Sequence, residues 1–313
     1  MSTVRAAVVG TGHLGGFHAE KYAQLPNADL VAVCDLDPNI GKAVANTHGA
    51  AFTVDYRELI GKTDAVTIAT DTSVHFEVAR FFLENRVHVL VEKPMTTTSA
   101  EGRILTDLAE RNDLRLQVGH VERFNPAFLS ARERLGTVQF IECHRLAPFK
   151  DRGADVNVVL DLMIHDLDVI LSLVSGTPSS VSAVGIPVLT KTADIANARI
   201  EFDTGAIANV TASRVSTSTQ RKFRVFHEDQ YLSMDFGGGE VRLVTHDSTH
   251  GSGQLALQEQ KWSLQKGDAL LAETKAFISA IEASSPCQVT GYDGVAALEL
   301  AESIITDMQA RAL

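Results

Sequence analysis

The chain has 313 residues, of which 45% are hydrophobic and 21% are charged, as in globular proteins with room for two domains. Its formal net charge of −11 argues against nucleic acid or an anionic membrane surface as a partner. No apolar run approaches the roughly 20 residues of a membrane span. The N-terminal residues leave no room for a signal peptide, and the three cysteines are far apart in the sequence. We therefore expect a soluble cytoplasmic protein.

Residues 1–120 alternate short apolar runs with helix-like segments. The apolar runs are Arg5–Val9, Leu30–Cys34, Ala65–Ala69, Val87–Val91 and Leu116–Gly119. Such continuous runs are typical of strands that are covered on both faces, and the helices between them indicate a parallel sheet. The pattern predicts a doubly wound α/β domain over residues 1–120.

A G-x-G-x-x-G turn follows the first predicted strand and leads into a helix. The residues predicted to bind the cofactor there are Gly10, Gly12, His13, Leu14 and Gly15. In such turns the glycines permit a tight bend, a close approach of pyrophosphate and close helix–strand packing, and the phosphates lie at the positive helix N-terminus. The alternative is a glycine turn that binds no nucleotide, but the strand before it and the helix after it favour a dinucleotide.

Asp35 ends the second predicted strand, 20 residues beyond Gly15. A carboxylate at this place accepts hydrogen bonds from both ribose hydroxyls of NAD and repels the 2′-phosphate of NADP. Neither Leu36 nor Asp37 supplies a cation to offset that repulsion. We therefore predict NAD as the cofactor, preferred over NADP.

Two further strand ends carry polar side chains. Thr70 follows the third strand with His75 five residues later, and the Glu92-Lys93-Pro94 triplet follows the fourth. Ligands of open α/β sheets bind beyond the carboxyl ends of the strands, so we predict that these residues contribute to the cofactor cleft. The alternative for Glu92 and Lys93 is a solvated ion pair, which a central strand end disfavours.

Residues 158–174 form a nearly continuous apolar segment that predicts a buried helix. Asp161, His165, Asp168 and Ser172 recur at i, i+4, i+7 and i+11 and so form one stripe at about 100° per residue. Titratable groups in an apolar helix are costly unless each has a partner or a ligand. A capping Asp with a satisfied core His is the alternative, but a stripe of four favours a functional site.

The pattern changes after residue 136. The predicted strands are Thr137–Leu146, Val181–Leu189, Ala196–Phe202, Ala206–Val215, Phe223–Phe226 and Tyr231–Phe236, and the predicted helices are Leu270–Ala283 and Asp293–Ala310. They predict an antiparallel sheet backed by the 158–174 helix, in a second domain over 121–313 whose C-terminal helices pack against both domains. His246 and His250 lie in a predicted loop with no evident third ligand, so no metal site is predicted.

Four motifs together resemble the Gfo/Idh/MocA oxidoreductase family: the Gly10–Gly15 turn, Asp35, the Glu92-Lys93-Pro94 triplet and the Asp161-x-x-x-His165 helix. The resemblance covers almost the whole chain. It implies a Rossmann domain followed by an α/β domain with a large, mostly antiparallel sheet. It also implies a nicotinamide cofactor, a sugar, inositol or nucleotide-sugar substrate, and a homodimer or homotetramer. The family motif Thr-Pro-x-x-x-His has Asp71 in place of the proline here.

The segment Gln117–Pro126 (QVGHVERFNP) is similar to a subgroup of this family that includes UDP-N-acetylglucosamine 3-dehydrogenase-like proteins. The polar side chains predicted to bind the substrate are His120, Arg123, Arg145, Lys150 and Arg152. Arginine forks match phosphate oxygens, so converging cations would favour a UDP-sugar. The alternative is that these side chains are simply solvated.

The resemblance implies a catalytic set of Lys93, Asp161 and His165. We predict that His165 takes the hydroxyl proton, because its ordinary pKa of about 6.5 lies near working pH. Asp161 would hold its tautomer, and Lys93 would hydrogen-bond the substrate oxygen. The favoured interpretation is an NAD-dependent dehydrogenase of a nucleotide sugar. The alternatives are a dehydrogenase of a free sugar, inositol or cyclic polyol, and an NAD(H)-binding regulator without turnover.

Overall fold

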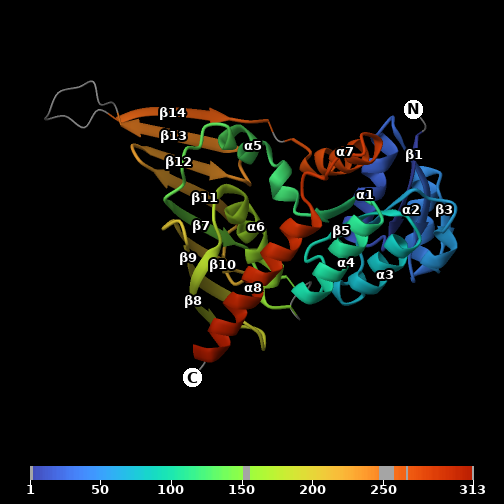
Figure 1. Cartoon of the computed structure of the whole chain (residues 1–313), viewed down its shortest axis with the longest axis horizontal. Coiled ribbons are helices and arrows are strands. Elements are labelled where there is room, and N and C mark those ends of the chain that lie inside the picture. The colour runs from blue at the N-terminus through green and yellow to red at the C-terminus, as the bar shows by residue number, and fades with distance from the viewer. Residues whose placement is uncertain (1–2, 151–155, 247–256, 266, 312–313) are drawn as a thin grey trace, which may run out of the picture. The chain divides into compact units, whose positions relative to one another are not determined.

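The computed structural model describes residues 3–150, 156–246, 257–265 and 267–311. Its internal contacts divide the chain into two units (Figure 1). Unit 1 comprises Met1–Val121 and Asp268–Leu298, and unit 2 comprises Glu122–Gly267 and Glu299–Leu313. None of the helices in the described ranges combines the length and the apolar character that a membrane span requires.

Unit 1 is built on a six-stranded parallel sheet in the order β3-β2-β1-β4-β5-β6. Its strands are β1 Val4–Val9, β2 Ala28–Cys34, β3 Ala51–Thr53, β4 Ala65–Ile68, β5 His88–Glu92 and β6 Leu116–Gly119. This order is that of doubly wound dinucleotide-binding domains, and it confirms the predicted parallel sheet. Strand β3 is only three residues long, too short to show a periodic pattern, and it was not predicted.

Helices follow the strands of unit 1 and share its core. They are α1 His13–Gln24, α2 Pro38–His48, η1 Tyr56–Leu59, α3 Thr72–Glu84, α4 Ser99–Arg111, α7 Ala269–Glu282 and the first part of α8 Gly291–Arg311. The local sequence favours the start of α4, where Thr98 and Glu101 form a capping box. Tyr22 on α1, Leu90 on β5 and Phe277 on α7 are fully buried in one apolar cluster. Residues far apart in sequence thus form one core.

Unit 2 contains an eight-stranded sheet in the order β14-β13-β12-β11-β7-β10-β9-β8. Its strands are β7 Phe140–Leu146, β8 Pro178–Ile186, β9 Ile195–Phe202, β10 Ile207–Ser213, β11 Gln220–His227, β12 Gln230–Asp235, β13 Glu240–His246 and β14 Leu257–Ser263. All neighbours are antiparallel except β7 and β10. The mostly antiparallel sheet is as predicted, but β13 and β14 were missed.

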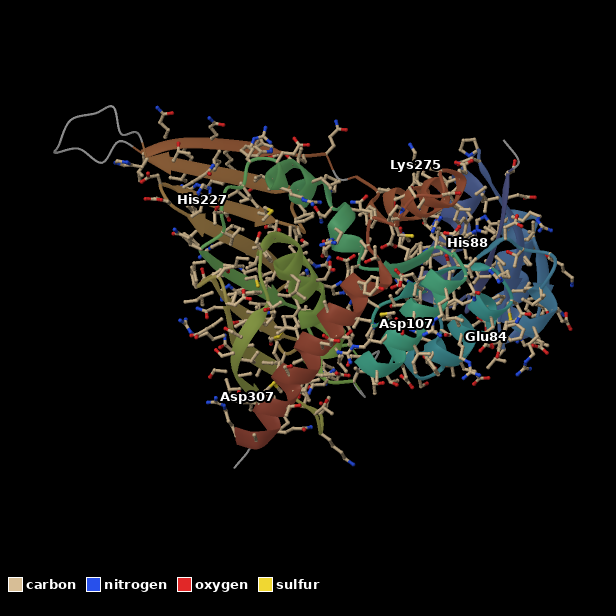
Figure 2. All side chains as sticks on the ribbon, in the orientation of Figure 1. Glu84, His88, Asp107, His227, Lys275 and Asp307 are labelled. Carbon is tan, nitrogen blue, oxygen red and sulfur yellow. The ribbon has the colours of Figure 1, made fainter. Side chains whose placement is uncertain are left out.

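One face of this sheet is covered by helices. They are α5 Pro126–Arg132, the π-helical turn η3 Val159–Met163, α6 Ile164–Leu173 and the last part of α8, and the short η2 Val121–Phe124 precedes them. Phe128, Leu167, Phe223 and Ile304 lie in the shared core. On α8, Asp307 (labelled in Figure 2) accepts a hydrogen bond from the Ala183 N–H of β8 at 2.6 Å. This bond ties the chain's last helix to the edge strand.

Candidate active site

The glycine turn after β1 has the shape that dinucleotide phosphates require. Gly10 has φ +85°, and a Cβ there would lie 2.7 Å from the Ala69 carbonyl oxygen. A Cβ at Gly15 would collide with the Gly10 carbonyl oxygen, so the start of α1 packs closely on the strand. Gly12 has no heavy atom within 4 Å of its Cβ position, which leaves space beside the helix N-terminus. The turn therefore fits a pyrophosphate, with exposed His13 and half-buried Leu14 opening α1.

Asp35, at the end of β2, is held against this turn. Its Oδ2 accepts hydrogen bonds from the Thr11 N–H at 2.6 Å and the Thr11 hydroxyl at 2.7 Å. Its Oδ1 accepts one from the Asp37 N–H at 2.9 Å. These bonds fix a half-buried carboxylate at the edge of the turn, the place where a ribose hydroxyl acceptor is expected.

His75 joins the ends of β4 and β5. Its Nδ1 lies 3.0 Å from the Pro94 carbonyl oxygen and its Nε2 lies 3.1 Å from the Thr70 carbonyl oxygen. The ring is 1% exposed, and burial lowers the pKa of His75 while the two carbonyl acceptors oppose that effect. Asp71 replaces the family's proline, but its φ of −67° is the angle that a proline ring imposes. Asp71 therefore has a backbone angle that the family's proline would also adopt, and cofactor contacts by Thr70 and His75 remain predictions.

Glu92 ends strand β5 and Lys93 follows it, but the two do not form a simple solvated pair. The Glu92 side chain is buried, and its Oε1 lies 2.8 Å from His18 Nε2 on α1. Lys93 is half-buried. His18 was not predicted as a site residue, and its signal in the sequence is a histidine on the buried face of the helix that follows the glycine turn.

The predicted helix at 158–174 forms, but its first turn is wider than an α-helix. The Ile164 N–H bonds to the Val159 carbonyl, an i→i+5 bond, before α6 continues in the ordinary geometry. The wider turn rotates fewer degrees per residue, so a uniform α-helical stripe is only approximate. Asp161 lies within this π turn, and His165 follows it, both half-buried. Such turns occur often at functional sites.

Buried ion pairs occupy two arginines that were predicted to bind substrate. Arg145, 4% exposed, donates to both carboxylate oxygens of Asp166 at 2.8 and 2.9 Å and to Glu122 Oε1 at 3.0 Å. Arg123 Nε lies 3.8 Å from Asp168 Oδ2. These contacts use the guanidinium of Arg145 within unit 2, so we do not assign it to a substrate diphosphate.

The remaining predicted substrate residues differ in exposure. His120, after β6, is 1% exposed, whereas Lys150 is exposed beyond β7. Arg152 lies outside the described residues. Convergence of the predicted cationic side chains on a substrate therefore stays a prediction.

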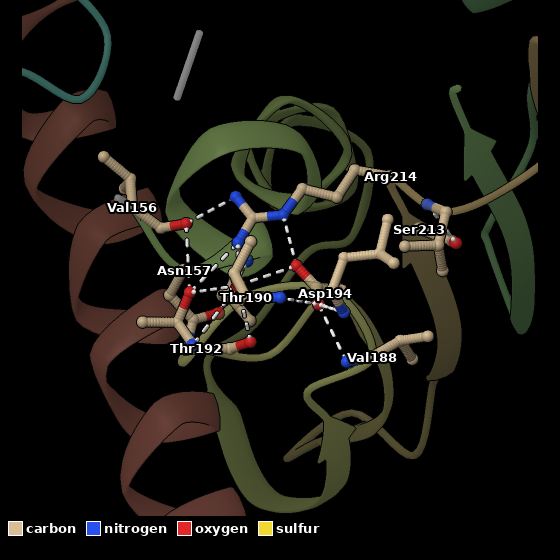
Figure 3. A network of polar contacts seen from close by, with 11 residues as sticks. Val156, Asn157, Val188, Thr190, Thr192, Asp194, Ser213 and Arg214 are labelled. Atoms are coloured by element: carbon tan, nitrogen blue, oxygen red, sulfur yellow. Dashed lines mark hydrogen bonds and ion pairs between the residues drawn. The ribbon is translucent and has the colours of Figure 1, made fainter. Parts of the chain in front are cut away.

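A buried ion pair also holds the start of the helix that carries Asp161 and His165 (Figure 3). Asp194 Oδ2 accepts hydrogen bonds from the three backbone N–H groups of residues 188–190 at 2.6–2.8 Å. Its Oδ1 accepts from Arg214 Nε at 2.8 Å, and Arg214 Nη1 donates to the Val156 carbonyl at 2.6 Å. The pair thus links the β8–β9 loop, the residue after β10, and Val156, two residues before the helical segment.

The two units each match a family model. Residues 4–120 match an oxidoreductase family with an NAD-binding Rossmann fold, and residues 129–233 match the GFO/IDH/MocA C-terminal domain. The chain belongs to the Gfo/Idh/MocA oxidoreductase family. Membership confirms the predicted family, fold class and enzyme class. The N-terminal domain of this family is an NAD-binding Rossmann domain.

Several Gfo/Idh/MocA proteins are similar to the chain over nearly its whole length. UDP-N-acetylglucosamine 3-dehydrogenase of Acidithiobacillus ferrooxidans is 37% identical over 295 residues, 94% of each chain. A solved structure of this enzyme, GnnA, covers 99% of each chain with a TM-score of 0.94 at 36% identity. Inositol 2-dehydrogenase of Rhizobium meliloti is 27% identical and covers 97% of this chain and 96% of its own.

Proposed function

We propose that the chain is an NAD-dependent dehydrogenase of a nucleotide sugar related to UDP-N-acetylglucosamine. The observation that carries the substrate is the 37% identity, over 94% of both chains, to a UDP-N-acetylglucosamine 3-dehydrogenase. The glycine turn with Asp35 supports the cofactor, and the half-buried Asp161 and His165 support acid–base chemistry. A regulator without turnover has no need of these last two groups.

In the proposed reaction a secondary alcohol becomes a ketone. NAD, when bound, would accept the hydride that leaves the carbinol carbon. An imidazole nitrogen of His165 takes the hydroxyl proton, and Asp161 holds the ring and stabilises its charged form. The Lys93 ammonium hydrogen-bonds the substrate oxygen. Proton transfer and oxygen polarisation are thereby assigned to different side chains.

A comparison of substrates tests this function. We expect NAD⁺ reduction, followed as NADH absorbance, with UDP-N-acetylglucosamine and little with myo-inositol or glucose at equal concentration. Turnover of the free polyols alone would contradict the nucleotide-sugar substrate and favour the second candidate, which the similarity to inositol 2-dehydrogenase supports. Tight NADH binding without turnover of any alcohol would favour the regulator.

The cofactor preference is proposed to depend on Asp35. Replacing Asp35 with Ser removes the charge that repels a 2′-phosphate, so we expect the NADP-to-NAD ratio of kcat/KM to rise by about tenfold, or ~1.4 kcal/mol. Asp37→Asn is the matched control, because that carboxylate instead caps α2 through the Asn39 N–H. An unchanged ratio in Asp35→Ser would refute this role.

The predicted homodimer or homotetramer also remains a proposal. Val184 and Ile186 on the edge strand β8 are 52% and 54% exposed, on the face away from the core. An interface between copies of the chain would cover this apolar surface.

A further inference from the structure

A buried glutamate directly precedes Lys93 and contacts a buried histidine, and neither has a role in the reaction described above. His18 is fully buried on α1, and Glu92 is 7% exposed at the end of β5. Their 2.8 Å contact joins the first helix to the strand that leads into Lys93. Two buried titratable groups are stable there because each is hydrogen-bonded to the other.

The fold reserves space for the Glu92 carboxylate at this strand end. Its Oε2 accepts a hydrogen bond from the Lys93 backbone N–H at 3.3 Å. Gly119 on β6 pairs with Glu92, and a Cβ on that glycine would lie 3.1 Å from Glu92 Oε2. The glycine therefore lets the carboxylate turn back onto the main chain of Lys93.

Several titratable groups surround this carboxylate. They are His18 from α1, His75 from α3, Lys93 itself and fully buried Glu273 from α7. Burial raises the pKa of Glu92, but the His18 hydrogen bond and charge, together with the Lys93 charge, outweigh it and hold that pKa below its usual value. An ionised carboxylate next to an amine in turn favours the charged ammonium form.

We infer that His18 and Glu92 are positioning residues for Lys93. The pair fixes the main chain at Lys93 and keeps its side chain an ammonium at working pH. Lys93 is then a hydrogen-bond donor to the substrate oxygen, and the hydroxyl proton goes to His165. The inference rests on the proposed dehydrogenase function and assigns the role of base to His165 rather than to Lys93.

Competitive labelling with acetic anhydride measures the protonation of Lys93 without turnover. Acetylation of the peptide that contains Lys93 is followed by mass spectrometry across a pH series, since only the neutral amine reacts. In Glu92→Gln we expect the midpoint for Lys93 to fall by about one pH unit, because a nearby negative charge is lost. In His18→Leu we expect a smaller fall, because the Glu92 carboxylate loses the hydrogen bond that holds it in place beside Lys93.

His88→Gln is the matched control. His88 lies at the opposite end of β5 (Figure 2), where its Nδ1 accepts a hydrogen bond from the Arg115 N–H at 2.9 Å. This variant should leave the Lys93 midpoint unchanged. An unchanged midpoint in folded Glu92→Gln overturns the inference. If that variant does not fold, an unchanged midpoint in His18→Leu overturns it instead.

The rate profile connects the pair to the reaction. In Glu92→Gln the alkaline limb of kcat/KM should move to lower pH by the same amount as the labelling midpoint, whereas a purely structural role would lower protein stability without moving the limb. A limb that stays in place overturns the role of the pair in turnover. A wild-type chain without dehydrogenase activity would instead refute the proposed function, and the labelling result would still decide whether the pair controls Lys93.

Discussion

His165→Ala is expected to lower kcat about 10²–10⁴-fold, the range that a positioned acid–base group contributes. The methyl side chain cannot accept the hydroxyl proton, while the glycine turn and Asp35 lie in unit 1 and are untouched by the change. NADH affinity, measured by the cofactor's fluorescence, should therefore remain close to the wild-type value. Steady-state rates with UDP-N-acetylglucosamine and NAD⁺ measure the loss.

His227→Ala is the matched control for that variant. His227 also belongs to unit 2 and lies at the end of β11 (Figure 2), where its Nδ1 contacts the Glu228 carbonyl at 3.1 Å. Its removal should leave kcat unchanged. Equal turnover of His165→Ala and wild type would remove His165 from the mechanism, and equal losses in the two histidine variants would indicate a general effect on unit 2.

The sequence was most informative where local chemistry determines structure. The glycine turn was predicted because each glycine has its own steric requirement, which the structure shows at Gly10 and Gly15. The strands of unit 1 were predicted because buried parallel strands are continuously apolar. Strand β14 was missed because its exposed sequence LQEQKWS shows no apolar alternation.

Long-range pairing explains what the sequence could not predict. Nothing near Arg145 in sequence shows that Asp166, 21 residues away, will accept hydrogen bonds from two nitrogens of its guanidinium group. His18 and Glu92 are 74 residues apart and meet only because α1 packs on β1 and β4, next to β5 in the sheet. The π turn at Val159–Met163 changes the rotation per residue, which a helical-wheel argument assumes to be constant. A charged residue can therefore be assigned to a ligand only after its partners in the folded structure are known.

Asp194→Ala is expected to destabilise unit 2 by about 3–5 kcal/mol, because it leaves the buried charge of Arg214 without its partner. Both side chains are at most 5% exposed. Trp262, the single tryptophan of the chain, lies on β14 of unit 2, so its fluorescence during urea unfolding reports on this unit. Adding Arg214→Met should restore part of the loss, since no charge then remains buried.

Glu142→Gln is the control for this stability prediction. Its pair with Arg224 is about one-third exposed, so its removal should cost no more than about 1 kcal/mol. A loss in Asp194→Ala that is no larger than this would show that the buried pair does not hold unit 2 together.

The stability contribution of Asp194 should also depend on pH in a defined direction. Burial raises the pKa of Asp194, but the N–H groups of residues 188–190 and the Arg214 fork outweigh it and hold the pKa well below its usual range. A carboxyl whose pKa is lowered by folding contributes its full stability above its unfolded pKa of about 3.9, and this is lost as the pH falls further. Wild type should therefore lose stability below about pH 4 more steeply than Asp194→Asn, which has no proton to bind there. Parallel slopes for the two proteins, measured by Trp262 fluorescence between pH 5 and pH 2.5, would contradict the ionised pair as the link between the β8–β9 loop and the helix of Asp161 and His165.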